Sequence, residues 1–139
     1  MILLDTCVLS ALMRPQDNEP VVAWLDRQPS VSIWTTAITV LEIRFGLLTM
    51  PDGRRRAKFE QAFAALLQQD LEGRIAAFDL AAADAAAGLA AERRRKGRPI
   101  DVHDTQIASI ALARRAAIAT RNAKHFGDLS VTIIDPWTV

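Results

Sequence analysis

The sequence contains one cysteine, Cys7, among its 139 residues, and no long hydrophobic run. A single cysteine excludes a disulfide within the chain and suits a reducing cytosol. No segment approaches the roughly 18 uncharged apolar residues that span a bilayer. The apolar start of the chain lacks the basic segment and the cleavage site of a signal peptide, and Asp5 interrupts it. We therefore expect a cytoplasmic protein that does not associate with membranes.

The sequence also carries little net charge. Its 17 basic and 16 acidic residues leave a formal charge of +1 at pH 7, so the overall field indicates little about partners. Basic residues are concentrated in two runs, 54–58 and 93–98, which is a modest indication of a polyanionic ligand. The second run also ends an expected helix near Gly97, where solvated cations complement the helix dipole. Both interpretations stay open for this run.

What the sequence does contain is an alternation of strands and helices in a composition typical of globular proteins, with 50% hydrophobic and 24% charged residues. Strands are expected at 2–4, 31–34, 74–78, 117–120 and 131–134. Helices are expected at 8–13, 20–27, 37–49, 80–96 and 102–115, with a further amphipathic helix that includes 59–67. This order predicts an α/β fold, a three-layer sandwich whose central parallel sheet of about five strands is flanked by helices. Residues 1–139 are long enough for one domain with a substantial core.

Asp5 closes the first apolar strand and is followed by the small polar residues Thr6 and Cys7. In open α/β sheets, ligands bind at the carboxyl ends of the strands, where Asp5 would lie. A carboxylate there is costly to desolvate unless a positive group meets it. Capping of the following short helix is an alternative role for Asp5, and this segment alone does not decide between the two.

Three further acids lie within a predicted helix or at the start of one. Glu42 is the only acid in an otherwise apolar helix, where its alternatives are a pair with Arg44 or exposure to solvent. Asp101 and Asp104 flank the start of the helix predicted over 102–115. Asp101 suits the N-cap, which leaves Asp104 in the first turn, free to bind a ligand.

Asn122 follows the strand predicted over 117–120, and its alternative role is to cap the next short segment. If the sheet is parallel, Asn122 converges at one edge with Asp5, Glu42 and Asp104. Oxygen ligands without clustered histidine or cysteine suit a hard cation, Mg²⁺ with Mn²⁺ as an alternative. Such a cation relieves the repulsion among packed carboxylates and can activate water for attack on a phosphodiester.

Several sequence blocks together resemble one known family. In order, they are residues 1–6 (MILLDT), 37–46 (AITVLEIRFG), 98–100 (RPI), 104–108 (DTQIA), 119–122 (ATRN) and 136–137 (PW). Their order and spacing are similar to those of the PIN-domain ribonucleases, and more narrowly to the VapC/FitB-like toxins of type II toxin–antitoxin systems. The resemblance extends over essentially the whole chain.

The resemblance implies a PIN-like fold and Mg²⁺-dependent endoribonuclease activity on an RNA substrate. It also implies a homodimer, inhibition by a cognate VapB/FitA-like antitoxin, and a larger toxin–antitoxin–DNA assembly. Asp5 and Asp104 would be the principal metal ligands, and Glu42 would hold a metal-bound water or support the ligands from outside the coordination sphere. Asn122 stands where many members of the family carry a fourth acid, which leaves the presence of a second metal open.

A second departure from the family is Cys7, where Asn or Ser is usual. We interpret it as a weakly polar filler beside the site rather than a nucleophile. Together with Asn122, it keeps an alternative open, in which the chain is a non-catalytic PIN-like module that binds RNA or protein. A receiver-like or phosphatase-like fold with a phosphorylated Asp5 is disfavoured, because the second acid of an Asp-x-Asp motif is replaced by Cys7.

Overall fold

The computed structural model describes residues 1–98 and 101–139. Five strands form one sheet: β1 (Ile2–Leu4), β2 (Ile33–Thr36), β3 (Ile75–Ala76), β4 (Ala117–Ala119) and β5 (Ile133–Ile134). The helices in the described residues are α1 (Thr6–Leu12), α2 (Glu19–Asp26), α3 (Ala37–Thr49), α4 (Arg54–Ala65), α5 (Leu80–Arg95) and α6 (Val102–Arg114). Short helical turns lie at η1 (Pro15–Asp17), η2 (Ser30–Ser32), η3 (Leu66–Asp70) and η4 (Ala123–His125).

The sheet is parallel throughout, with the strand order β3-β2-β1-β4-β5. β1 is central, since Ile2 pairs with Ile33 of β2 on one side and with Ala117 of β4 on the other. The carboxyl ends of β1 and β4 therefore lie side by side, and the backbone N–H of Asp5 donates to the carbonyl of Ala119 at 3.0 Å. The predicted α/β sandwich with a five-stranded parallel sheet is confirmed.

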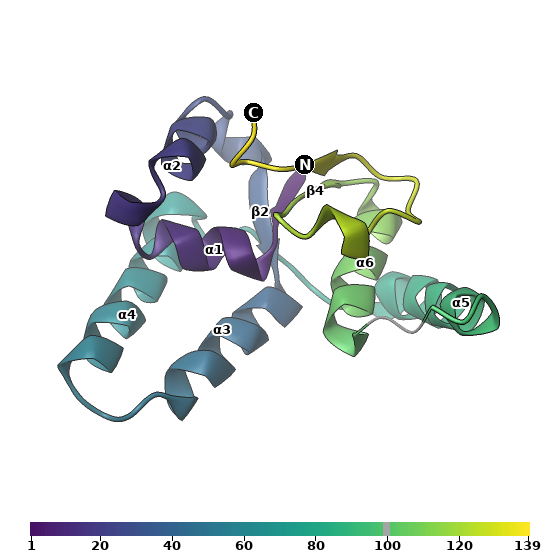
Figure 1. Cartoon of the computed structure of the whole chain (residues 1–139), viewed down its shortest axis with the longest axis horizontal. Helices are drawn as coiled ribbons and strands as arrows, with labels where there is room; N and C mark the ends of the chain where they lie inside the picture. The colour runs from purple at the N-terminus through teal and green to yellow at the C-terminus, as the bar shows by residue number, and fades with distance from the viewer. Residues whose placement is uncertain (99–100) are drawn as a thin grey trace.

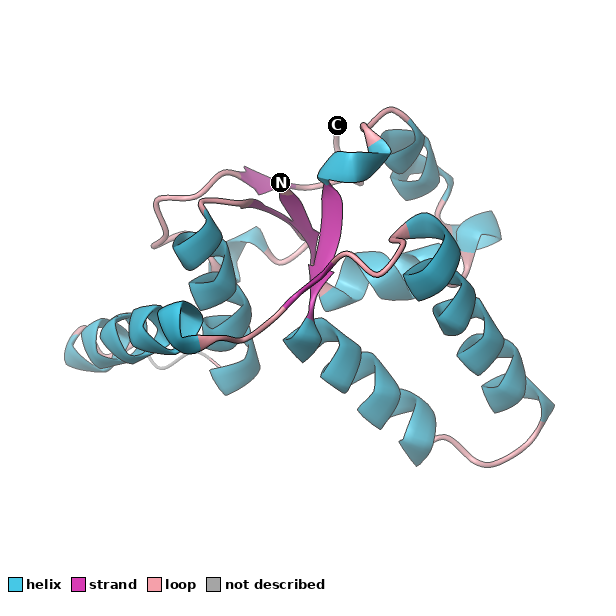
Figure 2. Cartoon of the chain, turned by 180° about the vertical axis from the view of Figure 1, so that it is seen from behind, coloured by secondary structure: helices cyan, strands magenta, loops and turns pink. Residues whose placement is uncertain are grey.

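Helices cover both faces of the sheet, as Figures 1 and 2 show. The two faces follow from alternation along β1, because successive side chains of a strand point to opposite sides. Leu4 joins a core built largely from α1, α2, α3 and the end of α4, in which Trp24 is 4% exposed. Leu3 joins a second core that includes Ile107 and Ile110 of α6. In Figure 1, α5 and α6 accordingly lie on the opposite side of the strands from α2 and α4.

The second strand begins later than its hydrophobicity indicates. A strand was expected over 31–34, but Val31 lies in the turn η2 and is 74% exposed. The strand instead includes the buried residues Thr35 and Thr36. Thr35 is accommodated in the sheet because its hydroxyl donates to the carbonyl of Leu4 at 2.9 Å, which satisfies a buried polar group. Polar residues therefore extend this strand toward its carboxyl end.

Other expected elements agree more closely with the structure. α3 has the predicted bounds, 37–49. Asp79 caps α5 through a hydrogen bond from the backbone N–H of Ala82, and Gly97 follows this helix with a positive φ of 65°. The third strand is shorter than predicted, at Ile75–Ala76, and the helix through Phe59 ends in the π-helical turn η3. The Pro99-Ile100 step of the family motif lies outside the described residues.

None of the helices in the described part of the chain is both long enough and apolar enough to cross a membrane.

Candidate functional site

Asp5 is buried at the carboxyl end of β1, with a relative exposure of 4%. Its Oδ1 accepts a hydrogen bond from the backbone N–H of Thr6 at 2.8 Å, and its Oδ2 accepts one from the hydroxyl of Thr120 at 2.7 Å. Asp5 therefore occupies the N-cap of α1 and the edge of the sheet together. The two roles that the sequence left open are compatible in one residue.

Burial is the main cause of a raised pKa at Asp5, because it penalises the charged form of the carboxyl. The hydrogen bonds from Thr120 and Thr6 oppose this shift, and the negative charge of Glu42 adds to it. The pKa of Asp5 stays raised despite these donors. A positive group at this position would reverse the balance.

Glu42 extends from α3 toward the start of α1. Its Oε1 accepts a hydrogen bond from the hydroxyl of Thr6 at 2.6 Å, and its Oε2 lies 3.4 Å from Nδ1 of His103. The alternative pair with Arg44 is not formed, because the Arg44 guanidinium lies over the ring of Phe63 at 5.7 Å. Glu42 is thus directed to the same end of the sheet as Asp5.

Asp104 comes to the site from the first turn of α6. The side chain of Asp101 accepts from the backbone N–H groups of His103 and Asp104, so Asp101 is the N-cap as predicted. Asp104 is then free to lie 2.9 Å from Nδ1 of His125. Its pKa is raised, first by burial and then by the charge of Asp5, while His125 opposes the shift. The acids predicted at 5, 42 and 104 are therefore electrostatic neighbours.

Asn122 is exposed and follows β4 by three residues, at the start of η4. Its side chain makes no capping hydrogen bond, so the capping alternative is not supported. Its backbone N–H donates to Oγ1 of Thr120 at 3.0 Å, and the Thr120 hydroxyl in turn donates to Asp5. Asn122 is placed beside the acids through Thr120 rather than by a contact of its own amide.

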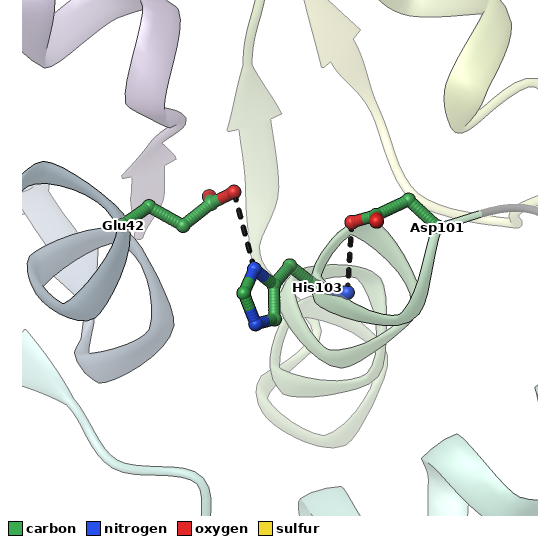
Figure 3. A group of neighbouring side chains, drawn as sticks. All are labelled: Glu42, Asp101 and His103. Atoms are coloured by element: carbon green, nitrogen blue, oxygen red, sulfur yellow. Dashed lines mark hydrogen bonds and ion pairs between the residues drawn. The ribbon is translucent and has the colours of Figure 1, made fainter. Parts of the chain in front are cut away.

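Two histidines that the sequence interpretation passed over lie next to these acids. His103 approaches Glu42, and His125 approaches Asp104. Figure 3 shows the first of these pairs, with His103 reaching from α6 toward Glu42 on α3. His103 could have been found from its place one residue before Asp104 in the first turn of a helix. For His125, which is 21 residues further along the chain, no local signal exists.

Arg93 forms a separate buried group beside the site. It is 3% exposed, and its guanidinium donates to both carboxylate oxygens of Asp128 at 2.8 and 2.9 Å. It also donates to the hydroxyl of Thr105 and to the carbonyl of His125. The prediction that the basic run 93–98 is a solvated helix end is therefore wrong for Arg93, because Asp128 and these oxygens satisfy it inside the protein.

Residues 2–130 match the family model for the PIN domain. The chain belongs to the PIN-domain family. The resemblance inferred from the sequence is confirmed for the family and for the fold.

Relatives of this PIN-domain chain align over nearly its full length. The VapC ribonuclease Y4jK of Sinorhizobium fredii is 39% identical over 137 residues, which cover 99% of this chain and 98% of that protein. The toxin FitB of Neisseria gonorrhoeae is 34% identical over 137 residues, with 99% of each chain covered. A solved structure of FitAB bound to an IR36 DNA fragment matches with a TM-score of 0.88 at 34% identity, covering 100% of this chain and 97% of that chain.

Cys7 in this PIN-domain chain lies beside the acids, as expected for a filler. Its Sγ is 3.8 Å from Oδ2 of Asp5 and 3.6 Å from Oγ1 of Thr120. Burial raises the pKa of the thiol, and the negative charge of Asp5 adds to the shift. Because the thiolate is the reactive form of cysteine, this environment disfavours a nucleophilic role for Cys7.

Proposed function

We propose that this PIN-domain protein is the toxin of a type II toxin–antitoxin module and hydrolyses RNA phosphodiesters in a reaction that depends on Mg²⁺, with Mn²⁺ as a substitute. The observation that carries the proposal is a group of carboxylates at 5, 42 and 104 without a fixed cation. Within residues 1–98 and 101–139, the salt bridges give these acids no lysine or arginine partner. Such a group is costly to bury unless a cation joins it.

The donor set fits a hard divalent cation, because the oxygens of Asp5 and Asp104 come from two elements that meet at one edge. Asp5 and Asp104 would hold the metal. When bound, the metal lowers the pKa of a water molecule and stabilises the negative charge that develops on the phosphate. Mg²⁺ commonly takes only one or two protein carboxylates and completes its shell with water and phosphate oxygens. The neutral amide of Asn122 is therefore compatible with one metal.

The remaining groups have positioning roles in this proposal. Thr120 and the N–H of Thr6 fix the Asp5 carboxylate in one orientation. Thr6 also fixes Oε1 of Glu42, so that the Glu42 carboxylate would hold a metal-bound water in position. Asn122 would orient a water molecule through its side-chain carbonyl.

A groove supplies a path for the RNA backbone to this site. It has a volume of about 620 Å³ and runs between α1, α3 and the start of α4. Glu42 and Thr6 line it together with Arg14, Arg54 and Arg55. Arginines in a groove that reaches Glu42 would contact phosphates, which makes binding depend on salt concentration.

The test compares Asp104→Asn with Asp84→Asn, which removes an exposed acid of α5 away from the site. The wild type and Asp84→Asn should cleave RNA in the presence of Mg²⁺, and Asp104→Asn should lose activity by on the order of 10³-fold, as when a group that stabilises the transition state is removed. Sequencing of the fragment ends should show 5′-phosphates and 3′-hydroxyls, because the attacking group is water rather than the ribose 2′-hydroxyl.

Two outcomes would contradict the proposal. One is 2′,3′-cyclic phosphate ends, which would mean that the 2′-hydroxyl attacks. The other is a wild-type protein that binds RNA without cleaving it and is as harmless in cells as Asp104→Asn. The second outcome would favour the alternative function, a non-catalytic PIN-like binding module, to which the exposed and neutral Asn122 lends some support.

The proposal includes a homodimer and a VapB/FitA-like antitoxin, with a larger assembly on DNA. α3 presents Leu41, Phe45 and Leu48 at 50%, 68% and 67% exposure, on positions that repeat along one face of the helix. An exposed apolar stripe of this kind is typical of an interaction surface. Light scattering on the purified protein should show a dimer, and a monomer at all concentrations would contradict the proposed homodimer. The lone Cys7 suits the cytoplasm as the compartment.

A further inference from the structure

Glu42, Asp101 and His103 form a second group of potential metal ligands at the mouth of the site. One ligand atom from each side chain lies within 4.8 Å of the other two. Figure 3 shows the arrangement, with Glu42 on α3 and the other two residues at the start of α6. Asp5 and Asp104, the proposed Mg²⁺ ligands, do not belong to this group. Only Glu42 is common to both.

Glu42 and His103 make a long polar contact between α3 and α6. Oε2 of Glu42 and Nδ1 of His103 are 3.4 Å apart, whereas charge-assisted hydrogen bonds measure about 2.7–2.9 Å. Two ligands of a tetrahedral zinc ion, each about 2.1 Å from the metal, lie about 3.4 Å from one another. The observed spacing therefore matches the separation of two ligands of one ion as well as that of a long direct contact.

Asp101 can supply the third ligand without giving up its cap. One of its oxygens, Oδ2, accepts the backbone N–H groups of His103 and Asp104. The other oxygen makes no hydrogen bond within the described part of the chain. Glu42 and His103 have side-chain exposures of 27% and 36%, so both can rotate slightly and water can complete the coordination.

The chemistry of this group differs from that of the acidic core. One imidazole and two carboxylates bind borderline ions such as Zn²⁺, whereas Mg²⁺ prefers oxygen ligands alone. We propose that Glu42, Asp101 and His103 form a binding site for a borderline divalent cation, typified by Zn²⁺, which shares Glu42 with the acidic core but none of the proposed Mg²⁺ ligands. A cation there joins α3 to the start of α6 and adds positive charge beside acids that have no lysine or arginine partner within the described residues.

Calorimetric titration of the untagged protein with Zn²⁺, in excess Mg²⁺, tests the site. The titration is made on Asp104→Asn, which keeps all three proposed Zn²⁺ ligands. We expect one Zn²⁺ per chain, and a thermal transition that rises when Zn²⁺ is added. Adding His103→Gln to this variant should weaken Zn²⁺ binding at least about tenfold, because a metal ligand is lost. Glutamine is a good helix former, so α6 should stay intact.

The matched control is His125→Gln in the same background, because His125 is the other histidine near the acids and is similarly exposed, at 38%. It should leave Zn²⁺ affinity within about twofold, since it is not a proposed ligand. The proposal is overturned if no Zn²⁺ binds, if His103→Gln leaves the affinity unchanged, or if His125→Gln weakens it equally. Circular dichroism without metal separates a folding defect from ligand loss.

This result is independent of the proposed ribonuclease activity. The measurement is binding to a variant that the proposed function already expects to be inactive. Zn²⁺ binding at His103 would stand even if the wild type cleaved no RNA, and RNA cleavage would stand even if Zn²⁺ did not bind. The two failures are therefore distinguishable.

Discussion

Two groups of buried charge lie close together in this protein, and they differ in how they are compensated. Arg93 and Asp5 are almost equally buried, at 3% and 4% exposure. Arg93 meets the carboxylate of Asp128 with two hydrogen bonds. Asp5 meets hydroxyl and amide donors, together with the further acids at 42 and 104.

The pKa values of the acids in the two groups shift in opposite directions, because only Asp128 has an arginine partner in the described part of the chain. Hydrogen bonds from Arg93 lower the pKa of Asp128, whereas burial raises the pKa of Asp5 and of Asp104. A compensated charge pair serves the fold, since it can be satisfied by the chain itself. Carboxylates that have no lysine or arginine partner among the described residues cost stability, and such a cost is typical of a site that awaits a ligand.

The two groups are also joined physically. Arg93 donates to Thr105, the neighbour of Asp104 in α6, and to the backbone carbonyl of His125, whose ring approaches Asp104. The compensated pair therefore holds two segments that carry the uncompensated group. The Arg93–Asp128 pair thus positions residues of the site without neutralising them.

The largest expected effect comes from breaking the compensated pair. Arg93→Ala removes the donors to Thr105 and to the carbonyl of His125 and leaves the partly exposed Asp128 without its partner, so we expect a loss of about 1–3 kcal/mol in the free energy of unfolding. Urea denaturation of the metal-free protein measures it. Arg94→Ala is the control, because this exposed neighbour should change stability by less than about 0.5 kcal/mol. Equal effects of the two variants would mean that the buried contacts of Arg93 stabilise the fold no more than an exposed arginine does.

Much of the fold could be predicted because it rests on local signals. The bounds of α3 and the caps Asp79 and Asp101 depend on residues that are close in sequence. The start of β2 could not be predicted, because Thr35 and Thr36 enter the sheet only when Leu4 offers an acceptor from another strand. Hydrophobicity alone therefore placed this strand two residues too early.

The residues of the site also divide into those with a local signal in the sequence and those without one. The carboxylates at 5, 42 and 104 each carried a local signal, a strand end, an apolar helix or a helix start, and the parallel sheet brings them together. The partnership of Arg93 with Asp128 spans 35 residues and that of His125 with Asp104 spans 21. No periodicity or capping rule connects such pairs, since they depend on how α5, α6 and η4 pack.

A smaller effect of opposite sign, a gain in the free energy of unfolding, should follow when one negative charge is removed from the group at 5, 42 and 104. Asp5→Asn keeps an N-cap side chain that can accept from Thr6 and removes a desolvated charge near Glu42. We expect the metal-free protein at pH 7 to gain on the order of 1 kcal/mol in the free energy of unfolding, while it loses RNA cleavage. Asp79→Asn is the matched control, because Asp79 is also an N-cap aspartate but is exposed. Its stability should change by less than about 0.5 kcal/mol.

If Asp5→Asn instead destabilised the protein by about as much as the loss of a buried hydrogen bond, about 1–3 kcal/mol, the Asp5 charge would not be a burden on the fold. Asp5 would then resemble Asp128, and the comparison between the two groups would fail. Urea denaturation in a chelating buffer makes this measurement.

The smallest effect is a dependence of stability on pH in the metal-free protein. Asp5 and Asp104 have pKa values raised above that of the unfolded chain, about 3.9. At pH values between the pKa of the unfolded chain and the raised pKa of the folded state, the folded state binds more protons than the unfolded state. Stability therefore falls as pH rises through this range. Asp128, with a lowered pKa, acts in the opposite sense and only below about pH 4. The window from about pH 4 to pH 6 therefore reports on the raised pKa values of Asp5 and Asp104 rather than on the lowered pKa of Asp128.

The expected slope in this window is a fraction of about 1.4 kcal/mol per pH unit, the limit for one proton. Thermal unfolding at several pH values in a chelating buffer measures it, and Asp5→Asn should flatten the curve. Saturating Mg²⁺ should flatten it as well, because a bound cation favours the charged carboxylates. A stability that instead rises from pH 4 to pH 6 would mean that the carboxylates are compensated within the chain, as Asp128 is by Arg93. The need for a metal at Asp5 and Asp104 would then lose its physical basis.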